Sequence, residues 1–124
     1  MSTWRRKALD LFPEFKQEIE ESDSPTDVWF EVESNLINAL KNSDDDFIKS
    51  VKQYFSWCVG TNDCSIPHQS ATCGFLENIG YRKEYWPYLN ILFTTQQFKM
   101  YKTTLGYSLS KEKLGEMENA FYGK

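Results

Sequence analysis

The side chains best suited to chemistry in this chain of 124 residues are three cysteines and its single histidine, which lie close together in the sequence. They follow the spacing C-x5-C-x3-H-x4-C and are Cys58, Cys64, His68 and Cys73. Three thiolates and one imidazole can hold a structural zinc ion, but no pair here has the tight C-x-x-C spacing of common zinc motifs. A cysteine on the apolar side of a helix usually packs as a small hydrophobic residue, as we expect for Cys58 and Cys73. We therefore predict free, buried thiols and no metal, with zinc as the alternative.

His68 is also the only imidazole that could activate a nucleophile. Cys–His and Ser–His–Asp sites need an orienting partner and an oxyanion hole, and nothing near His68 in the sequence supplies them. The chain has no glycine-rich phosphate-binding loop, no HExxH motif and no EF-hand pattern. We predict that the protein is not an enzyme and needs no cofactor. An enzyme that uses carboxylates or His68 is a third hypothesis, ranked after the two protein-binding functions described at the end of this section.

Carboxylates are concentrated in one part of the chain. Residues 14–46 contain eleven Asp or Glu and two Lys, a net charge of −9, whereas the remaining residues sum to +5. Within residues 18–34, seven carboxylates surround Trp29 and Phe30 without any Lys or Arg. This distribution disfavours direct nucleic-acid binding and favours a basic protein partner. We expect Trp29 itself to lie in the core.

The expected helix ends explain some of these acids but not others. Asp27 and residues 44–46 fall at helix starts, where capping and the helix dipole favour negative charge. Glu20, Glu21 and Asp23 fall near a helix end, where acids are unfavourable, so they are better candidates for function. The predicted partner-binding residues are Glu20, Glu21, Asp23, Asp27, Glu31, Asp44, Asp45 and Asp46. The alternative is a solvated acidic face without a partner.

The spacing of apolar residues predicts helices as the elements that position these side chains. We expect a first helix from about residue 4 to 21 with a kink at Pro13, followed by helices over 25–41, 43–58, 67–80, 94–105 and from 110 onward. The expected N-caps are Ser24, Ser43, Thr94 and Ser110, and Gly106 is the expected C-terminal stop. Residues 88–93, YLNILF, fit a short strand or a buried irregular run. The prediction is an all-α fold: one compact single-domain bundle of about six helices over residues 1–124.

Cellular location follows from apolar patterning and cysteine content. No apolar run approaches the length of about 18 residues that a membrane-spanning helix needs. The first twelve residues, MSTWRRKALDLF, lack the apolar core of a secretory signal. An odd number of cysteines also argues against a fully paired disulfide framework. We expect a cytoplasmic protein without membrane contact.

The segment Ala8–Val32, ALDLFPEFKQEIEESDSPTDVWFEV, resembles the N-terminal portion of a family of short, uncharacterised bacterial helical proteins. The shared pattern is an LFPE-like start, an acidic helix, a DSP cap and a Trp followed by an acid. The matching residues are Leu11, Phe12, Pro13, Glu14, Asp23, Ser24, Pro25, Trp29 and Glu31. The closing Leu109–Ser110 and the acidic helix after it are also similar, whereas the cysteine-containing middle is not, so the resemblance covers about half the chain. The family carries no established activity, so the resemblance implies a small helical fold and no functional residues.

In size, charge and lack of catalytic motifs the chain also resembles the immunity proteins of bacterial toxin systems such as contact-dependent growth inhibition. Those proteins are small, cytosolic and often acidic, and they neutralise toxins that are often basic nucleases. The resemblance implies a toxin inhibitor that binds a cognate basic toxin through its acidic face. The alternative is a small cytosolic helical domain with a structural or regulatory role, which associates with itself or with another protein.

Overall fold

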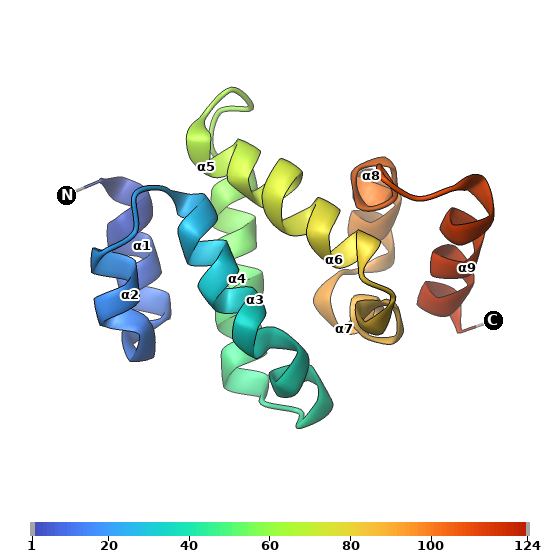
Figure 1. Ribbon diagram of the computed structural model, residues 1–124, viewed down its shortest axis with the longest axis horizontal. Coiled ribbons are helices and arrows are strands. Elements are labelled where there is room, and N and C mark those ends of the chain that lie inside the picture. Colours follow the sequence, from blue (N-terminus) through green and yellow to red (C-terminus); the bar gives the residue numbers. More distant parts are fainter. Residues whose placement is uncertain (1, 124) are drawn as a thin grey trace. The chain divides into compact units, whose positions relative to one another are not determined.

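A computed structural model describes residues 2–123, and every regular element within them is helical (Figure 1). The α-helices are α1 (Thr3–Leu11), α2 (Lys16–Glu20), α3 (Pro25–Lys41), α4 (Asp45–Val59), α5 (Ile66–Gln69), α6 (Glu77–Tyr81), α7 (Leu89–Leu92), α8 (Thr95–Leu105) and α9 (Lys111–Tyr122). Two 3-10 helices, η1 (Pro13–Phe15) and η3 (Lys83–Tyr88), and a π-helical segment, η2 (Ser70–Leu76), lie between them. The predicted all-α fold is confirmed. In this part of the chain, no helix combines the length and apolar character needed to cross a bilayer.

The expected number of about six helices is too low, because nine α-helical segments occur within residues 2–123. The first predicted helix is divided at Pro13, which lacks the backbone N–H of a continuous helix and begins η1 instead. The fourth predicted helix keeps its limits to within one residue, but η2 interrupts it. The ambiguous run at residues 88–93 is the end of η3 followed by α7, so the strand alternative is wrong.

The predicted boundaries of the two C-terminal helices are confirmed by their caps. Thr94 Oγ1 accepts a hydrogen bond from the Gln97 N–H at 3.1 Å, and the Gln97 side chain in turn accepts the Thr94 N–H at 2.9 Å. Ser110 Oγ accepts from the Lys113 N–H at 3.2 Å, and Gly106 occupies the C-cap of α8. These short-range bonds satisfy N–H groups that have no partner inside a helix.

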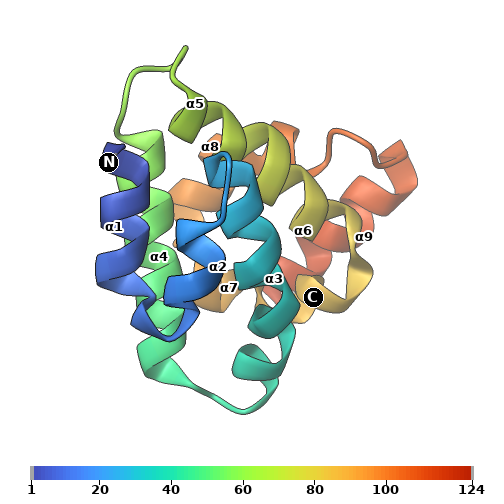
Figure 2. The same ribbon diagram turned by 60° about the vertical axis from the view of Figure 1, so that its left-hand side comes forward.

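The chain contains two compact units, one up to Phe75 and the other from Leu76 onward. In the first unit α4 packs against α1 and α3, and α2 packs against the same two helices (Figure 2). Its core contains Trp29, which is 1 % exposed and stacks on Phe75 with ring centroids 4.1 Å apart. Tyr54 lies beside the Trp29 ring at 5.1 Å. The core position predicted for Trp29 is therefore confirmed.

The second unit is organised around η3, which packs against α6, α7 and α9. Phe98 of α8 and Phe121 of α9 stack in parallel with ring centroids 4.0 Å apart. The single-domain prediction for residues 1–124 stays a prediction, because the compactness of each unit does not test whether the units fold independently.

Candidate functional site

An acidic cavity of about 650 Å3 lies in the first unit and opens to solvent. Its walls are the end of α1, η1, the last turns of α3 and the first turn of α4. Four carboxylates line it: Asp10, Glu14, Asp44 and Asp46. Three side-chain amides join them, those of Asn35, Asn38 and Asn42. The described lining contains no Lys or Arg, so no cation within the cavity neutralises its four carboxylates. The cavity can therefore accept a cationic group from a partner.

The turn between α1 and η1 places two of these carboxylates at the rim. Phe12 is the C-cap of α1, is completely buried, and makes the chain change direction before Pro13. Its ring contacts Tyr54 edge-on, with centroids 5.8 Å apart. Because the Phe12 side chain is fixed in the core, the flanking Asp10 and Glu14 are held on the solvent side of the same turn.

Two aromatic rings form the apolar part of the lining. Phe15 of η1 and Phe47 of α4 meet edge to face, with centroids 6.0 Å apart and ring planes at 82°. Both side chains are only partly buried, so part of their surface faces the cavity. Aromatic faces attract cations, and the planar guanidinium of arginine can stack on them while it pairs with carboxylates.

The start of α4 differs in detail from the prediction. Ser43 is not the N-cap; it has left-handed backbone geometry, with φ +55°, and turns the chain into the helix. Asp44 is the N-cap, and its Oδ1 accepts a hydrogen bond from the Phe47 N–H at 3.3 Å. Asp45 and Asp46 occupy the first turn, where the dipole favours them, as expected. Asp44 therefore has a structural role in addition to its place in the cavity.

The eight predicted partner-binding residues do not form one site. The cavity contains two of them, Asp44 and Asp46, and adds Asp10 and Glu14, which the prediction missed. Glu14 belongs to the LFPE-like pattern noted in the sequence, but no local signal indicates that residues 10–14 lie near residues 44–46. The six predicted residues outside the lining are Glu20, Glu21, Asp23, Asp27, Glu31 and Asp45.

A cation from another helix lies at the end of α2, next to the acids that the sequence places there. Glu20 is the last residue of α2 and Glu21 its C-cap, and both are exposed. The Arg5 guanidinium of α1 donates hydrogen bonds to the backbone carbonyls of Ile19, at 3.4 Å, and Ser22. A cation at a helix C-terminus is favourable, so Arg5 offsets the local cost attributed to these acids.

Asp27 at the start of α3 also has a structural partner. Its Oδ2 accepts a hydrogen bond from the backbone N–H of Asp23 at 2.9 Å. Ser24 occupies the N-cap position, as predicted, but its side chain makes no capping hydrogen bond. Asp27 thus ties the residue before the N-cap to the first turn of α3. Glu31 lies further along α3 and is partly buried.

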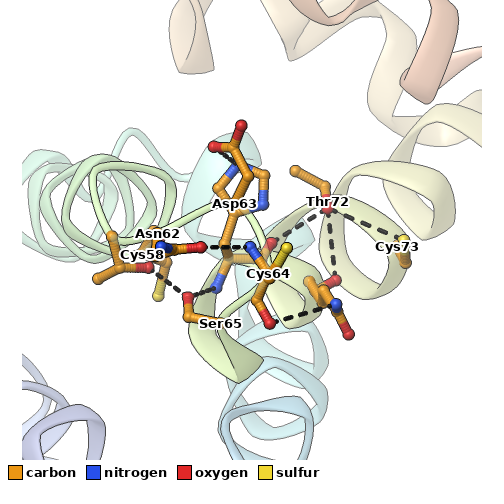
Figure 3. Close-up of polar contacts among 10 residues, drawn as sticks. Cys58, Asn62, Asp63, Cys64, Ser65, Thr72 and Cys73 are labelled. Atoms are coloured by element: carbon orange, nitrogen blue, oxygen red, sulfur yellow. Dashed lines mark hydrogen bonds and ion pairs between the residues drawn. The ribbon is translucent and has the colours of Figure 1, made fainter.

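Cys64 lies in the loop between α4 and α5, with Cys58 on α4 before it and Cys73 on η2 after it (Figure 3). The Thr61 hydroxyl donates to the Cys58 carbonyl at 2.6 Å, and the Cys64 N–H donates to Asn62 Oδ1 at 2.8 Å. His68 Nε2 lies 3.5 Å from Asp63 Oδ1. Across the described residues, no group of three or more His, Cys, Asp or Glu is arranged to hold a metal ion. The zinc alternative therefore has no geometric support.

All three thiols are free, but only one matches the predicted burial. Cys58 is completely buried; this burial raises the pKa of its thiol to about 12, although a hydrogen bond with Tyr54 lowers it. Cys64 and Cys73 are exposed, so the prediction of buried thiols is wrong for both. The buried positions of its helical segment are Ser70, Ala71, Phe75 and Leu76, and Cys73 lies midway between these two pairs, on the exposed side.

Comparison of the chain with protein-family models, with curated proteins and with solved structures gives no match.

Proposed function

We propose that the protein is a non-enzymatic inhibitor that binds a basic protein through the acidic cavity of its first unit, as an immunity protein neutralises a cognate toxin. The observation that carries the proposal is a cavity with four carboxylates and no described Lys or Arg in its lining. Such a cavity favours insertion of a basic side chain, because a partner that contributes a cation relieves the repulsion among the acids.

Arginine is the side chain that fits this lining best. Its guanidinium can pair with a carboxylate through two parallel hydrogen bonds, which a lysine ammonium cannot do. The rings of Phe15 and Phe47 provide apolar faces next to the carboxylates of Glu14 and Asp46. An arginine anchored in a desolvated pocket is a frequent source of binding energy in protein interfaces.

The acids outside the cavity have a second role in this proposal. Up to residue 75 the chain has thirteen Asp or Glu and seven Lys or Arg, a net charge of −6, whereas the remainder has a net charge of +2. The exposed Glu20, Glu21 and Asp23 extend the negative field of the first unit beyond the cavity. We expect these acids mainly to speed the approach of a basic toxin, by analogy with other immunity systems a nuclease, and to add little to the stability of the complex.

The alternative function is a structural or regulatory helical domain that associates with itself. Two large apolar side chains of the first unit favour it, since Phe30 is 53 % exposed and Ile66 is 62 % exposed. Sedimentation of the purified protein over a range of concentrations tests this alternative. A concentration-dependent dimer that dissociates on Phe30→Ser substitution would favour self-association over toxin binding.

The proposed function is tested by partner capture followed by binding with the purified partner. The immobilised protein is used to capture partners from the source organism, with Glu14→Gln plus Asp46→Asn as the cavity variant. Glu20→Gln plus Glu21→Gln is the matched control, because it removes the same charge outside the cavity. We expect the cavity variant to bind the purified basic partner at least about thirtyfold more weakly. Glu14 and Asp46 are exposed in the free protein but would be buried by the partner, and loss of one member of a buried charge pair costs about 2–5 kcal/mol.

The two parts of the proposal fail separately. A partner that binds the cavity variant and the wild type equally would show that the cavity is not the binding site. A partner that needs the cavity but does not arrest growth when expressed without this protein would remove the immunity function and leave the binding function. The neighbouring gene gives an independent check, because a large secreted protein ending in a short toxin domain is expected there.

A further inference from the structure

A second cavity lies in the second unit and has the opposite charge. Its volume is about 410 Å3, which falls within the range of about 300–1,000 Å3 that is typical of small-ligand sites. Its lining combines two ammonium groups, two aromatic side chains, two hydroxyls and one leucine. These residues are Tyr81, Lys83, Trp86, Ser108, Leu109, Ser110 and Lys113. No Asp or Glu belongs to this described lining.

One wall of this cavity is fixed by an unusually close approach of two backbones. A Cβ atom at Gly80 would lie 1.9 Å from the Leu105 carbonyl oxygen, so only glycine allows the end of α6 to lie against the end of α8. The Gly80 carbonyl accepts a buried hydrogen bond from Trp86 Nε1 at 2.8 Å. These two contacts fix Trp86 and the backbone of the intervening residues, which include Tyr81 and Lys83.

The opposite wall is fixed by the loop that leads into α9. A Cβ atom at Gly106 would lie 2.4 Å from Leu114 Cδ1, so the start of this loop is packed directly against the helix. Ser110 then caps α9, which places Lys113 one turn into the helix. Because both walls are formed before a ligand arrives, little ordering is needed on binding.

The two lysines suit a phosphate group. Lys83 Nζ lies 5.8 Å from the centre of the Trp86 ring, and the neighbouring cation, Arg82, pairs with Glu84 and leaves Lys83 available. Lys113 Nζ lies 3.7 Å from Glu116 Oε2, but both side chains are about half exposed. An exposed ion pair of this kind is weak, so a doubly charged phosphate can compete with Glu116 for Lys113.

The aromatic side chain at the edge of the cavity suits a planar ring. Both aromatic side chains line the cavity, but Tyr81 is 63 % exposed, whereas Trp86 is almost completely buried. Stacking of a nucleobase on an exposed aromatic ring is a common and sequence-tolerant contact. Binding of a nucleic-acid strand would need a basic groove on the protein that follows the phosphate backbone of the strand, but residues 76–124 have a net charge of only +2. The cavity therefore favours a single nucleotide over a strand.

We propose that this cavity binds a nucleoside monophosphate, with its phosphate between Lys83 and Lys113 and its base on the ring of Tyr81. Ser108 and Ser110 line the same cavity, and their hydroxyls can donate to the ribose or the phosphate. This site is independent of the acidic cavity in residues and in charge, and it does not depend on the proposed toxin-binding function.

The test is calorimetric titration of the intact protein, at low ionic strength, with adenosine 5′-monophosphate, adenosine and inorganic phosphate. We expect the monophosphate to bind at least about tenfold more tightly than either fragment, because the lysines hold one end and Tyr81 the other. Lys83→Gln plus Lys113→Gln should weaken it by about tenfold or more. Tyr81→Ala should reduce its affinity toward that of phosphate alone.

The matched control is Lys99→Gln plus Lys111→Gln, which removes the same charge from exposed positions outside the lining. This control should bind the monophosphate as the wild type does. Equal weakening by the two double variants would show that only overall charge matters and would overturn the proposal. So would phosphate binding as tightly as the monophosphate, or the absence of saturable binding by any of the three ligands.

Discussion

The close approach of α6 and α8 gives the sharpest quantitative prediction for this fold. In Gly80→Ala the new methyl group would lie 1.9 Å from the Leu105 oxygen and 2.5 Å from its carbonyl carbon. Both are backbone atoms, so no side chain can rotate away to make room. Ordinary contact begins at 3.4 Å, so the two backbones must move apart by about 1.5 Å, a strain of the kind that accompanies overpacking.

The expected cost of Gly80→Ala has two parts and one small compensation. Overpacking of a close contact costs about 1–3 kcal/mol. Separation of the helices also threatens the buried hydrogen bond from Trp86 to the Gly80 carbonyl, whose loss costs about 1–3 kcal/mol. Replacement of glycine by alanine in a helix returns about 0.5–1 kcal/mol. We therefore expect the free energy of unfolding to fall by about 1–5 kcal/mol, a large part of the stability of an ordinary domain.

Gly115→Ala is the matched control for this measurement. Gly115 lies inside α9, and a Cβ atom there has no neighbour within 4 Å. The same substitution should therefore stabilise the protein, by about 0.5–1 kcal/mol. Chemical denaturation followed by far-UV circular dichroism measures both variants. A neutral Gly80→Ala, or a shift of stability in the same direction in both variants, would show that the backbones of α6 and α8 are not in close contact at this point.

The remaining predictions concern the first unit. Arg5→Ala should lower stability by about 1–2 kcal/mol, because the Ser22 carbonyl loses its hydrogen bond from Arg5 and the Ile19 carbonyl keeps only the one from the Ser22 N–H, whereas the exposed Arg6→Ala should change it by no more than about 0.5 kcal/mol in the same denaturation assay. Iodoacetamide should modify two of the three cysteines of the native protein and all three in denaturant, with Cys58 the protected one by peptide mass spectrometry; early modification of Cys58 would contradict its burial. Burial raises the pKa of Cys58 from 9.0 in the unfolded chain to about 12, so the folded state favours the neutral thiol. The contribution of this thiol to the free energy of unfolding is therefore fully present below pH 9 and decreases as the pH rises toward 12. Thermal melts between these pH values should show a shallower decline in Cys58→Ala than in the wild type. Finally, Glu20→Lys with Asp23→Lys should slow association with a basic partner and weaken its salt dependence while the fold is kept, and an unchanged association rate at low and high salt would show that these acids are only a solvated face.

The helices of this protein are largely determined by local sequence, because the bonds that begin and end them join residues a few positions apart. The capping box at Thr94 and the cap at Ser110 were therefore predictable from residue type and spacing. The apolar period also identified Trp29 as a core residue, since a helix of known phase buries one side. Local signals failed where two neighbouring residues were nearly equivalent as N-caps: Ser43 forms a left-handed turn and Asp44 is the cap.

The candidate sites were decided by tertiary structure. The sequence showed that residues 14–46 are acidic, but only packing of α1 and α3 against α4 brings Asp10 and Glu14 to the same cavity as Asp46. Packing also places the Arg5 guanidinium at the end of α2. This cation offsets the unfavourable position of Glu20, Glu21 and Asp23 near a helix C-terminus, which was the reason to predict a function for them. The basic cavity of the second unit likewise depends on the contact of Gly80 with Leu105, which are 25 positions apart in the sequence. Composition and helical period fix which residues a helix exposes, whereas the meeting of side chains from distant helices is set by the shape of the core between them.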